Sequence, residues 1–398
     1  VHDKNKWQGF CEIESDPALF SVMIREMGVR GVCVREVYVA EPEFIKENVP
    51  EPLLGIILLF KFRPVDPDNE VESCPDNVWF ANQLPSQNSC ATLAMINMLL
   101  NTQDVNLGDH LQQFKEYSED LNPYHRGQAL STFEFVKRIH NSFAKKQDML
   151  QDDHDLAFKV AKNIKTRRGS LEERRLSASS DECLENQNHF IAFVPIDGKV
   201  WKLDGMDKMP TCLGEYDDEE YTWLDFVCDR IQAIMASAGD DGYGVLALAQ
   251  SPLEGLRKEM CTSIAGTKAI EARLDDLDAE WKAFLETNND GTVPGAMTSP
   301  SLLNSLGIFA DQLTAATVSD HLKKKIASED MPHLLSLREA ALKEQVKLQA
   351  SIMEEMDKES AEDEMAKERR HDYGPVISAW LRMLAENGYI EEVLGQYM

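Results

Sequence analysis

The sequence lacks any apolar run long enough to cross a lipid bilayer. Its longest such run, from Pro52 to Phe60, is far shorter than the roughly 20 residues that a membrane-spanning helix needs, and it is typical of a buried strand. Basic residues are also scarce, because 41 Lys and Arg stand against 69 Asp and Glu and give a formal net charge of −28. We expect so acidic a chain to avoid nucleic acid and anionic membranes, and to favour a protein partner or substrate with basic patches.

The eight cysteines form no metal-binding or redox motif. None stands in a CxxC pair, and no cluster of His and Cys has the spacing of a zinc site. No secretory signal peptide is expected ahead of Trp7. Reduced thiols in the cytoplasm or the nucleus are therefore the simplest expectation, with no metal and no cofactor.

At 398 residues, 43% of them hydrophobic, the chain is too long for one ordinary core. Its pattern changes near Ser251. Before that point helix and strand patterns alternate, and the runs 55–62 and 244–249 are expected to be core strands. After it, helical periodicity dominates. We therefore predict an α+β domain over residues 1–250 and an all-helical extension over residues 251–398.

Three helical segments are expected in the extension. Apolar residues recur at alternating three- and four-residue steps over 256–284, with Ser263 and Thr267 in two of the apolar positions, which predicts a coiled-coil-like seam. A second long helix is expected over about 333–370, with a charged and solvated far half. A short amphipathic helix is expected over 375–386.

Within the first domain, a polar loop ends in a cysteine that opens an apolar helix. The loop over 82–89 is rich in turn-forming residues, and Cys90 is followed by the helical run 91–100. Free backbone N–H groups and the positive end of the helix dipole stabilise a thiolate at such a position, and the thiolate is the nucleophilic form of cysteine. The alternative is a buried, inert cysteine, because a free cysteine is often a small core residue.

A histidine and an aspartate lie at the base of a predicted hairpin. Two apolar runs within 190–204 are expected to be antiparallel strands, joined by a turn at Asp197-Gly198. If the turn is centred on these two residues, His189 lies diagonal to Asp204 on one face of the sheet, within reach of a hydrogen bond. A slip of one residue would put them on opposite faces, and a histidine satisfied within a sheet is the alternative interpretation.

Cys90, His189 and Asp204 together supply the parts of a thiol-dependent hydrolase. A thiol nucleophile needs a base that takes its proton, and the base needs an acceptor that orients its ring. Asp204 would fix the tautomer of His189 and favour an imidazolium beside the thiolate. A tetrahedral intermediate also needs donors for its oxyanion, for which the backbone N–H of Cys90 and the side-chain amide of Gln83 are natural candidates.

Two stretches resemble those of the ubiquitin C-terminal hydrolase family of cysteine proteases. The first is Asn-Gln…Asn-Ser-Cys-Ala-Thr at 82–92, and the second is His-Phe-Ile-Ala-Phe-Val…Leu-Asp-Gly-Met at 189–206. The family's N-terminal signature is echoed at 7–17, and the resemblance covers about residues 1–250. It implies a papain-like cysteine protease fold with a central antiparallel sheet, flanking helices and a knotted chain path.

The resemblance also assigns roles to the site residues. It implies that Cys90 is the nucleophile, His189 the general base and acid, Asp204 the orienting residue and Gln83 the oxyanion-hole amide. One feature departs from the family, because the glutamine stands seven positions before the cysteine rather than six. Either the loop holds a one-residue bulge or the amide is placed differently, and Gln87 is a less suitable substitute because it lacks the preceding asparagine.

Residues 147–188 fall where the family has its active-site crossover loop. We expect most of this segment to be mobile, with one short helix around 156–164. The loop is long, and each doubling of loop length adds only about 0.6 kcal/mol of closure entropy. The chain is therefore expected to accept bulky leaving groups on ubiquitin. Ser170 and Ser177 follow paired arginines and resemble kinase sites, although a solvated loop with chance matches is the alternative.

Residues 368–388 resemble the C-terminal extension of the proteasome-associated members of the family, which the Polycomb-linked histone deubiquitinases share. In both groups an adaptor-domain protein docks on the extension and tunes catalysis, so the resemblance implies a proteasomal ubiquitin receptor or another adaptor on residues 251–398. The Polycomb type carries a very long insert before the extension. This chain has only the polar linker 287–300, which favours the proteasomal type, in the cytoplasm and the nucleus.

The resulting prediction is a deubiquitinating thiol hydrolase that cleaves isopeptide, peptide or ester bonds after the C-terminal glycine of ubiquitin. A Polycomb-type nuclear histone deubiquitinase is one alternative. A catalytically silent ubiquitin-binding scaffold is the other, and the intact set of Cys90, His189 and Asp204 argues against it.

Overall fold

The computed structural model forms two compact units. The first contains residues 1–249 and 362–398, and the second contains residues 250–361. Helix α14 (Met331–Arg370) contributes to both, because its last nine residues belong to the first unit. The structure describes residues 9–61, 73–84, 88–145, 149, 188–217, 221–238, 242–285 and 293–390.

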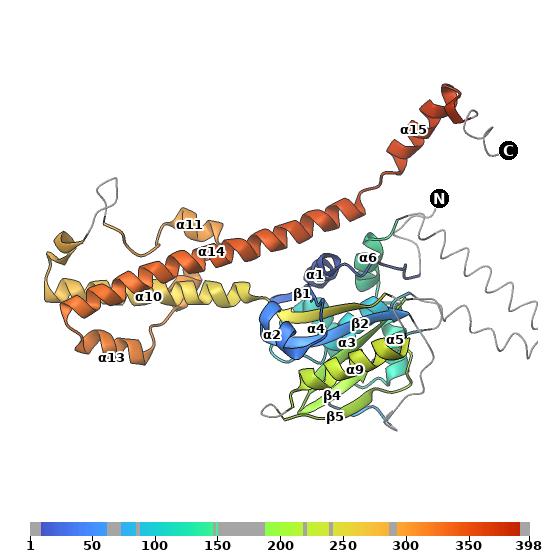
Figure 1. The fold of residues 1–398 in the computed structure, drawn as a ribbon, viewed down its shortest axis with the longest axis horizontal. Helices are drawn as coiled ribbons and strands as arrows, with labels where there is room; N and C mark the ends of the chain where they lie inside the picture. Colours follow the sequence, from blue (N-terminus) through green and yellow to red (C-terminus); the bar gives the residue numbers. More distant parts are fainter. Residues whose placement is uncertain are drawn as a thin grey trace, which may run out of the picture. The chain divides into compact units, whose positions relative to one another are not determined.

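A six-stranded sheet lies at the centre of the first unit (Figure 1), with the strand order β1-β6-β2-β3-β4-β5. Strand β2 pairs antiparallel with β3 and β6, and β4 pairs antiparallel with β3 and β5. The predicted α+β class with an antiparallel sheet is confirmed, whereas the knotted path stays a prediction. The strands are β1 (Val32–Glu36), β2 (Leu53–Lys61), β3 (Asn188–Ile196), β4 (Lys199–Leu203), β5 (Thr211–Glu215) and β6 (Gly244–Gln250).

Helices cover both faces of this sheet. Alternating residues of a strand point to opposite faces, so Ile57 packs with α1 and α3 in one core cluster, whereas Ile56 packs with α2 and α9 in another. Helix α3 is buried along nearly all of its length, and it therefore forms a fixed platform on its face of the sheet. The helices of the first unit, besides the end of α14, are α1 (Pro17–Glu26), α2 (Pro42–Asn48), α3 (Cys90–Leu99), α4 (Gly108–Ser118), α5 (Pro123–Ser131), α6 (Glu134–Ser142), α9 (Trp223–Ala238) and the fully unburied α15 (Gly374–Glu386).

The local signals in the sequence mark most of these elements correctly. Helix α1 begins where the Asp16 side chain accepts a hydrogen bond from the backbone N–H of Ala18, at 2.8 Å, and it ends before Gly28, whose φ is +97°. The helix expected to begin at Cys90 and the helix expected over 375–386 are present as α3 and α15. No described helix is long and apolar enough to cross a membrane.

The second unit is helical, but its packing differs from the single predicted seam, and the domain boundary expected at residue 250 stays a prediction. Helix α10 ends at Leu277, which is 43% exposed, so the seam predicted through Phe284 is wrong at its far end. Trp281 enters the core through a short 3-10 turn, where its indole N–H donates to the Asp275 carboxylate at 2.7 Å. The elements are α10 (Pro252–Leu277), η2 (Trp281–Phe284), α11 (Pro300–Ser305), α12 (Ala310–Ala315), α13 (Asp320–Ser328) and α14 as far as residue 361.

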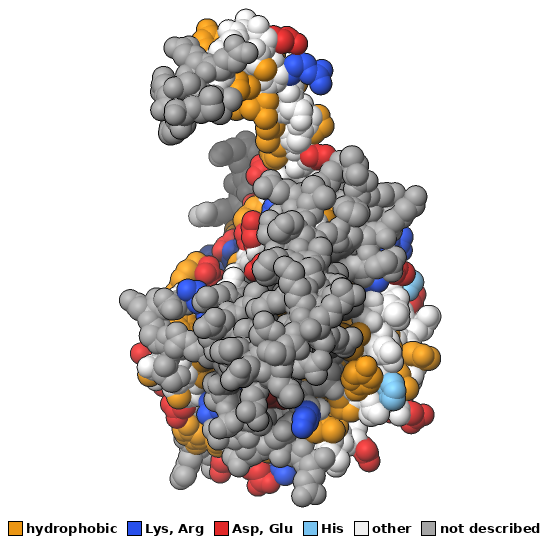
Figure 2. Space-filling model, turned by 90° about the vertical axis from the view of Figure 1, so that its right-hand side faces the viewer, with side chains coloured by type: hydrophobic (Ala, Val, Ile, Leu, Met, Phe, Trp, Pro, Cys, Tyr) orange, Lys and Arg blue, Asp and Glu red, His pale blue; other side chains and the backbone are white. Residues whose placement is uncertain are grey.

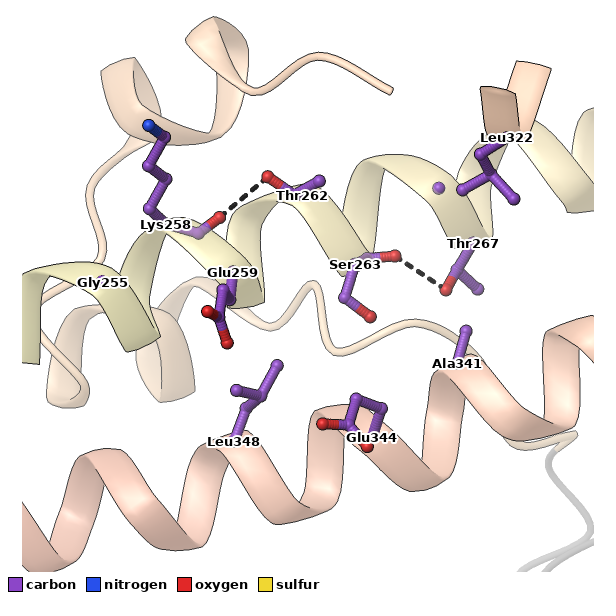
Figure 3. Close-up of a pocket in the computed structure, with 11 residues that line it drawn as sticks. Gly255, Lys258, Glu259, Thr262, Ser263, Thr267, Leu322, Ala341, Glu344 and Leu348 are labelled. Atoms are coloured by element: carbon purple, nitrogen blue, oxygen red, sulfur yellow. Dashed lines mark hydrogen bonds between the residues drawn. The ribbon is translucent and has the colours of Figure 1, made fainter. Parts of the chain in front are cut away.

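The two polar positions in the predicted seam have a packing partner. Gln345 of α14 is fully buried and donates to the Thr267 hydroxyl of α10 at 2.9 Å, while Thr267 donates to the Ser263 carbonyl. Small side chains at this level leave a groove of about 540 Å³ between the two helices, which Leu322 of α13 also lines (Figure 3). A buried polar contact thus replaces the apolar one that a coiled coil would place there.

The end of α14 is only partly solvated, although its charge predicts a solvated helix. Glu362 accepts from Arg25 of α1 at 2.5 Å and from Arg35 of β1 at 3.0 Å, and Arg25 also donates to Asp363. Between these charges and the helix end, Ala366 is only 1% exposed and packs in the core cluster of α1 and α3. One side of this segment therefore pairs with charges elsewhere in the first unit, while Asp363, Glu364 and Lys367 stay largely exposed.

The last residue of α14 makes the largest set of these contacts. Arg370 forms a two-pronged ion pair with Glu26, at 2.7 and 2.6 Å, and donates to the Ser142 hydroxyl of α6 at 3.0 Å. Its guanidinium also lies 4.1 Å from the centroid of the Phe143 ring. Arginine suits this position because its planar fork pairs with a carboxylate and stacks on an aromatic face at once.

We predict that Arg370→Ala loosens the contacts of residues 362–370 with helices α1 and α6. The variant loses an ion pair worth about 0.2–1 kcal/mol and a cation–π contact worth about 0.5–1 kcal/mol. Hydrogen exchange followed by mass spectrometry should show faster exchange in this segment. Lys367→Ala is the matched control, because Lys367 is exposed and pairs with Glu364 on the same helix. Equal exchange in the two variants would contradict the assignment.

Candidate active site

Cys90 is the first residue of α3, as its sequence context predicts. The first backbone bond of the helix runs from Leu93 N–H to Ser89 O, at 2.7 Å, so the N–H groups of residues 90–92 have no carbonyl within the helix to donate to. Cys90 is partly exposed, whereas four other cysteines, Cys11, Cys33, Cys228 and Cys261, are buried. The accessible position at a helix start does not fit the inert-cysteine alternative.

The hairpin that carries His189 has the predicted turn and register. Asp197 and Gly198 have φ values of +48° and +75°, the left-handed backbone of a two-residue hairpin turn. Ala192 pairs with Leu203, the register expected for a turn centred on these two residues. On its other side, His189 pairs with Phe60 of β2. The base of the hairpin therefore lies inside the sheet.

The structure brings Cys90, His189 and Asp204 together. The Nε2 atom of His189 lies 2.7 Å from Oδ1 of Asp204, and the imidazole also forms a hydrogen bond with the Cys90 side chain. Asp204 Oδ1 accepts a second bond from the backbone N–H of Met206 at 2.9 Å. Because Nε2 is engaged with the carboxylate, Nδ1 is the ring nitrogen left to face the sulfur.

Burial and charge act in opposite directions on this pair. Loss of hydration alone would lower the pKa of His189 and raise that of Asp204, because burial penalises the charged form of each. The charge of each partner and the hydrogen bond between them outweigh burial. The pKa of the His189 imidazole is therefore raised and that of the Asp204 carboxyl is lowered, and the contact with Cys90 raises the pKa of His189 further. The imidazole that faces the Cys90 sulfur is therefore protonated at neutral pH.

Gln83 reaches this site through its backbone. Its N–H donates to the carbonyl of Gly205 at 2.8 Å, which ties it to the residue directly after Asp204. A Cβ on Gly205 would lie 3.1 Å from that same nitrogen and 2.3 Å from a methyl of Leu93, so only glycine allows this approach. The alternative amide, Gln87, lies outside the described residues, and the oxyanion role of Gln83 stays a prediction.

Two residues that hold this segment were not predicted from the sequence. The side-chain amide of Asn82 donates to the Asp207 carbonyl at 2.6 Å, and its backbone N–H donates to the Pro123 carbonyl of α5 at 3.0 Å. Gly127 of α5 lies so close that a Cβ there would approach the Asn82 oxygen to 2.0 Å. A glycine in the middle of an amphipathic helix was the one available signal, since it usually marks a close packing contact.

The remaining predictions about the site are not decided by the described residues. The crossover loop at 147–188, with its short helix and with Ser170 and Ser177, falls almost entirely outside them. Among the described residues, one group could offer three ligands to a metal, namely Glu329, Asp330 and His333 on and just before α14. The expectation of a site without metal or cofactor stays a prediction.

Comparison with known proteins gives one family. The model of ubiquitin carboxyl-terminal hydrolase, family 1, matches residues 10–236, a range that includes Cys90, His189 and Asp204. Ubiquitin carboxyl-terminal hydrolase isozyme L5 of Dictyostelium discoideum is 31% identical over 289 residues, which cover 72% of this chain and 75% of the relative. The hydrolase ubh-4 of Caenorhabditis elegans is 32% identical over 282 residues, which cover 69% and 77%.

A longer relative matches a larger part of the chain at lower identity. Ubiquitin carboxyl-terminal hydrolase BAP1 of Xenopus tropicalis is 28% identical over 337 residues. The match covers 81% of this chain but only 43% of that protein. The similarity to BAP1 therefore extends beyond the family model and into the helical part of the chain.

We predict that Gly127→Ala destabilises the first unit although alanine is the better helix former. The added methyl meets a backbone oxygen that cannot move without displacing Asn82, and such overpacking costs about 1–3 kcal/mol. Gly255→Ala in α10 is the control, because its methyl would meet nothing within 4 Å and should stabilise by up to about 1 kcal/mol. Thermal unfolding measures both, and a neutral Gly127→Ala would refute the close approach.

Proposed function

The chain belongs to the ubiquitin carboxyl-terminal hydrolase family 1, and from that membership we propose that Cys90, His189 and Asp204 are its catalytic residues. The enzyme is a cysteine-type ubiquitin hydrolase. In our proposal it cleaves isopeptide, peptide or ester bonds directly after the C-terminal glycine of ubiquitin. The observation that carries the assignment is the buried His189–Asp204 pair, bonded to a cysteine at a helix start.

The first step forms a bond between Cys90 and the substrate. The thiolate sulfur attacks the carbonyl carbon of the last ubiquitin glycine, and the carbonyl oxygen takes up the negative charge. The backbone N–H of Cys90 lies at the start of α3 with no helical partner and donates to this oxyanion. The side-chain amide of Gln83 is proposed as the second donor, because its backbone is tied to Gly205 beside the triad.

The second step expels the leaving group. The His189 imidazolium gives its proton to the leaving nitrogen or oxygen, the scissile bond breaks, and a thioester joins Cys90 to ubiquitin. Asp204 keeps the ring in place throughout, because its carboxylate accepts from Nε2 in both protonation states of the ring. His189 then takes a proton from water, and the hydroxide attacks the thioester carbon. The carbon–sulfur bond breaks, Cys90 leaves as the thiolate beside the His189 imidazolium, and ubiquitin departs with a free carboxylate.

The proposal is tested with a ubiquitin whose C-terminus carries a thiol-reactive vinyl methyl ester. The wild-type chain should form a one-to-one covalent adduct, and Cys90→Ala should form none. Cys212→Ala is the control, because Cys212 is another partly exposed cysteine and should leave labelling unchanged.

Two results would contradict the enzyme assignment. Labelling that persists in Cys90→Ala would place the nucleophile elsewhere. A folded wild-type chain that binds ubiquitin without reacting would favour the silent scaffold over the hydrolase.

We further propose that α15 is a docking surface for an adaptor protein. None of its residues is buried, although the helix is amphipathic and apolar on one face. Figure 2 shows hydrophobic side chains gathered on this helix at the top of the view. A face of this kind is normally covered by a partner. The exposed fractions are 65% for Val376, 51% for Ile377, 59% for Trp380, 46% for Leu381 and 61% for Met383.

The adaptor that we propose is a proteasomal ubiquitin receptor. We therefore propose that the enzyme acts in the cytoplasm and the nucleus. The short internal linker at 287–300 and the higher identity to isozyme L5 and ubh-4 than to BAP1 support this choice. The Polycomb-type nuclear deubiquitinase stays the alternative, because BAP1 matches 81% of the chain.

We predict that Trp380→Glu abolishes adaptor binding. The substitution places a charge at the centre of the apolar face. When the adaptor docks, this charge would be buried with no opposite charge to pair with. Arg382→Ala, an exposed polar change on the same helix, should leave binding intact. Affinity purification of the full chain should recover proteasome subunits that Trp380→Glu loses. Recovery of Polycomb-group subunits would support the alternative, and recovery of neither would contradict adaptor docking on α15.

A further inference from the structure

A second histidine lies near the candidate triad, and it is more deeply buried than the first. His140 of α6 is fully buried, and both of its ring nitrogens make short hydrogen bonds. Its Nδ1 lies 2.7 Å from the Thr92 hydroxyl of α3, and its Nε2 lies 2.7 Å from the backbone carbonyl of Cys11. Thr92 is itself fully buried and stands two residues after Cys90.

The partners of His140 fix its protonation. A carbonyl oxygen can only accept, so Nε2 carries the proton and donates to Cys11. Burial lowers the pKa of His140 to about 4, so the ring is neutral at physiological pH and Nδ1 holds a lone pair. The Thr92 hydroxyl therefore donates to Nδ1. This direction has a structural consequence, because a hydroxyl committed to His140 is not bonding back to a carbonyl of its own helix.

The far side of His140 is anchored as well. The next residue of α6, Asn141, accepts from the Cys11 N–H at 3.1 Å and donates to the Gly9 carbonyl at 2.9 Å. The Phe10 ring packs edge-on against the His140 ring, with centroids 4.9 Å apart. Two successive residues of α6 thus hold the extended segment 9–11, and His140 joins this segment to the first turn of α3.

In the described part of the chain, the bond from Thr92 is a side-chain hydrogen bond that ties the first turn of α3 to another helix. The N-cap residue of α3, Ser89, makes no side-chain capping bond, although serine is among the residues that most often do. The position of this turn decides where the Cys90 sulfur and the Cys90 N–H point. His189, which they must meet, comes from the separate strand β3. The reaction therefore depends on how the turn is held from outside.

We propose that His140, acting through its hydrogen bond to Thr92, is a positioning residue that holds the first turn of α3 in the orientation that catalysis needs. The inference rests on the proposed role of Cys90. It assigns to His140 no contact with substrate and no proton transfer. A displacement of about 1 Å at a reacting atom can cost about 100-fold in rate, so a lost anchor should appear in kcat.

The experiment removes the hydroxyl of Thr92 and nearly nothing else. Thr92→Val keeps the shape of the side chain and loses the donor, Thr92→Ala loses the donor and also volume, and Thr92→Ser keeps the donor. Thr211→Val of β5 is the matched control, because Thr211 is 1% exposed and its hydroxyl oxygen has no hydrogen-bond partner in the described part of the chain. Each full-length variant is assayed with a fluorogenic amide on the C-terminus of ubiquitin, below its own unfolding temperature.

We expect Thr92→Val and Thr92→Ala to lower kcat at least tenfold with KM within about twofold of the wild type. Thr92→Ser should restore kcat to within threefold, and Thr211→Val should match the wild type. A purely structural role would lower the unfolding temperature while leaving kcat of the folded enzyme unchanged. Values of kcat within threefold of wild type in both donor-free variants would overturn the proposal, as would an equal loss in Thr92→Ser.

The same assay separates this inference from the proposed function. If the wild-type chain does not cleave the ubiquitin amide, the proposed function fails. If the wild type cleaves it and the donor-free variants cleave it equally well, only the role of His140 fails.

Discussion

The structure of the candidate site depends on one buried hydrogen bond, between the imidazole of His189 and the carboxylate of Asp204. Both side chains are almost fully buried, and each would be destabilised in its charged form without the other. The bond joins the first strand of the hairpin to the residue that follows the second. It therefore needs the register that the Asp197-Gly198 turn sets, since a slip of one residue would break it.

The rest of the first unit brings two other groups to this pair. Helix α3 packs along most of its length against the sheet and presents Cys90 at its N-terminal end. The segment through Asn82 and Gln83 is held between α5 and the loop after Asp204. A side chain on Gly127 would meet the Asn82 backbone, and one on Gly205 would meet a methyl of Leu93. The site is thus assembled from elements that are distant in sequence, and polar bonds rather than apolar packing set its final geometry.

The sequence predicts this site well where the signals are local. The turn at Asp197-Gly198, the cysteine at a helix start and the cap of α1 each depend on neighbouring residues, and each has the predicted structure. The hairpin register predicts that His189 and Asp204 meet, and the family resemblance assigns their roles and that of Cys90. The sequence could not show contacts between distant segments, such as those of Gly127 with Asn82 and of His140 with Thr92. A local pattern, such as a glycine within a helix, does not identify the distant partner.

Two errors in the helical part have the same origin. The heptad spacing of Trp281 predicts that the seam of α10 continues through it, but Asp278 takes an extended backbone and ends the helix. The high charge at the end of α14 predicts a solvated helix, but Glu362 pairs with two arginines of the first unit. Its partners, Arg25 and Arg35, lie more than 300 residues away in sequence, so the charge pattern alone could not reveal them.

In the site described above, His189 stays protonated at neutral pH, because Asp204 accepts its Nε2 proton and Cys90 faces its other nitrogen. Nitrogen-15 NMR of the nine histidines, with His189→Gln to assign the signal, tests it directly. Both ring nitrogens of His189 should still carry protons at pH 8. Loss of the second proton at or below the ordinary histidine pKa of about 6.5 would contradict it.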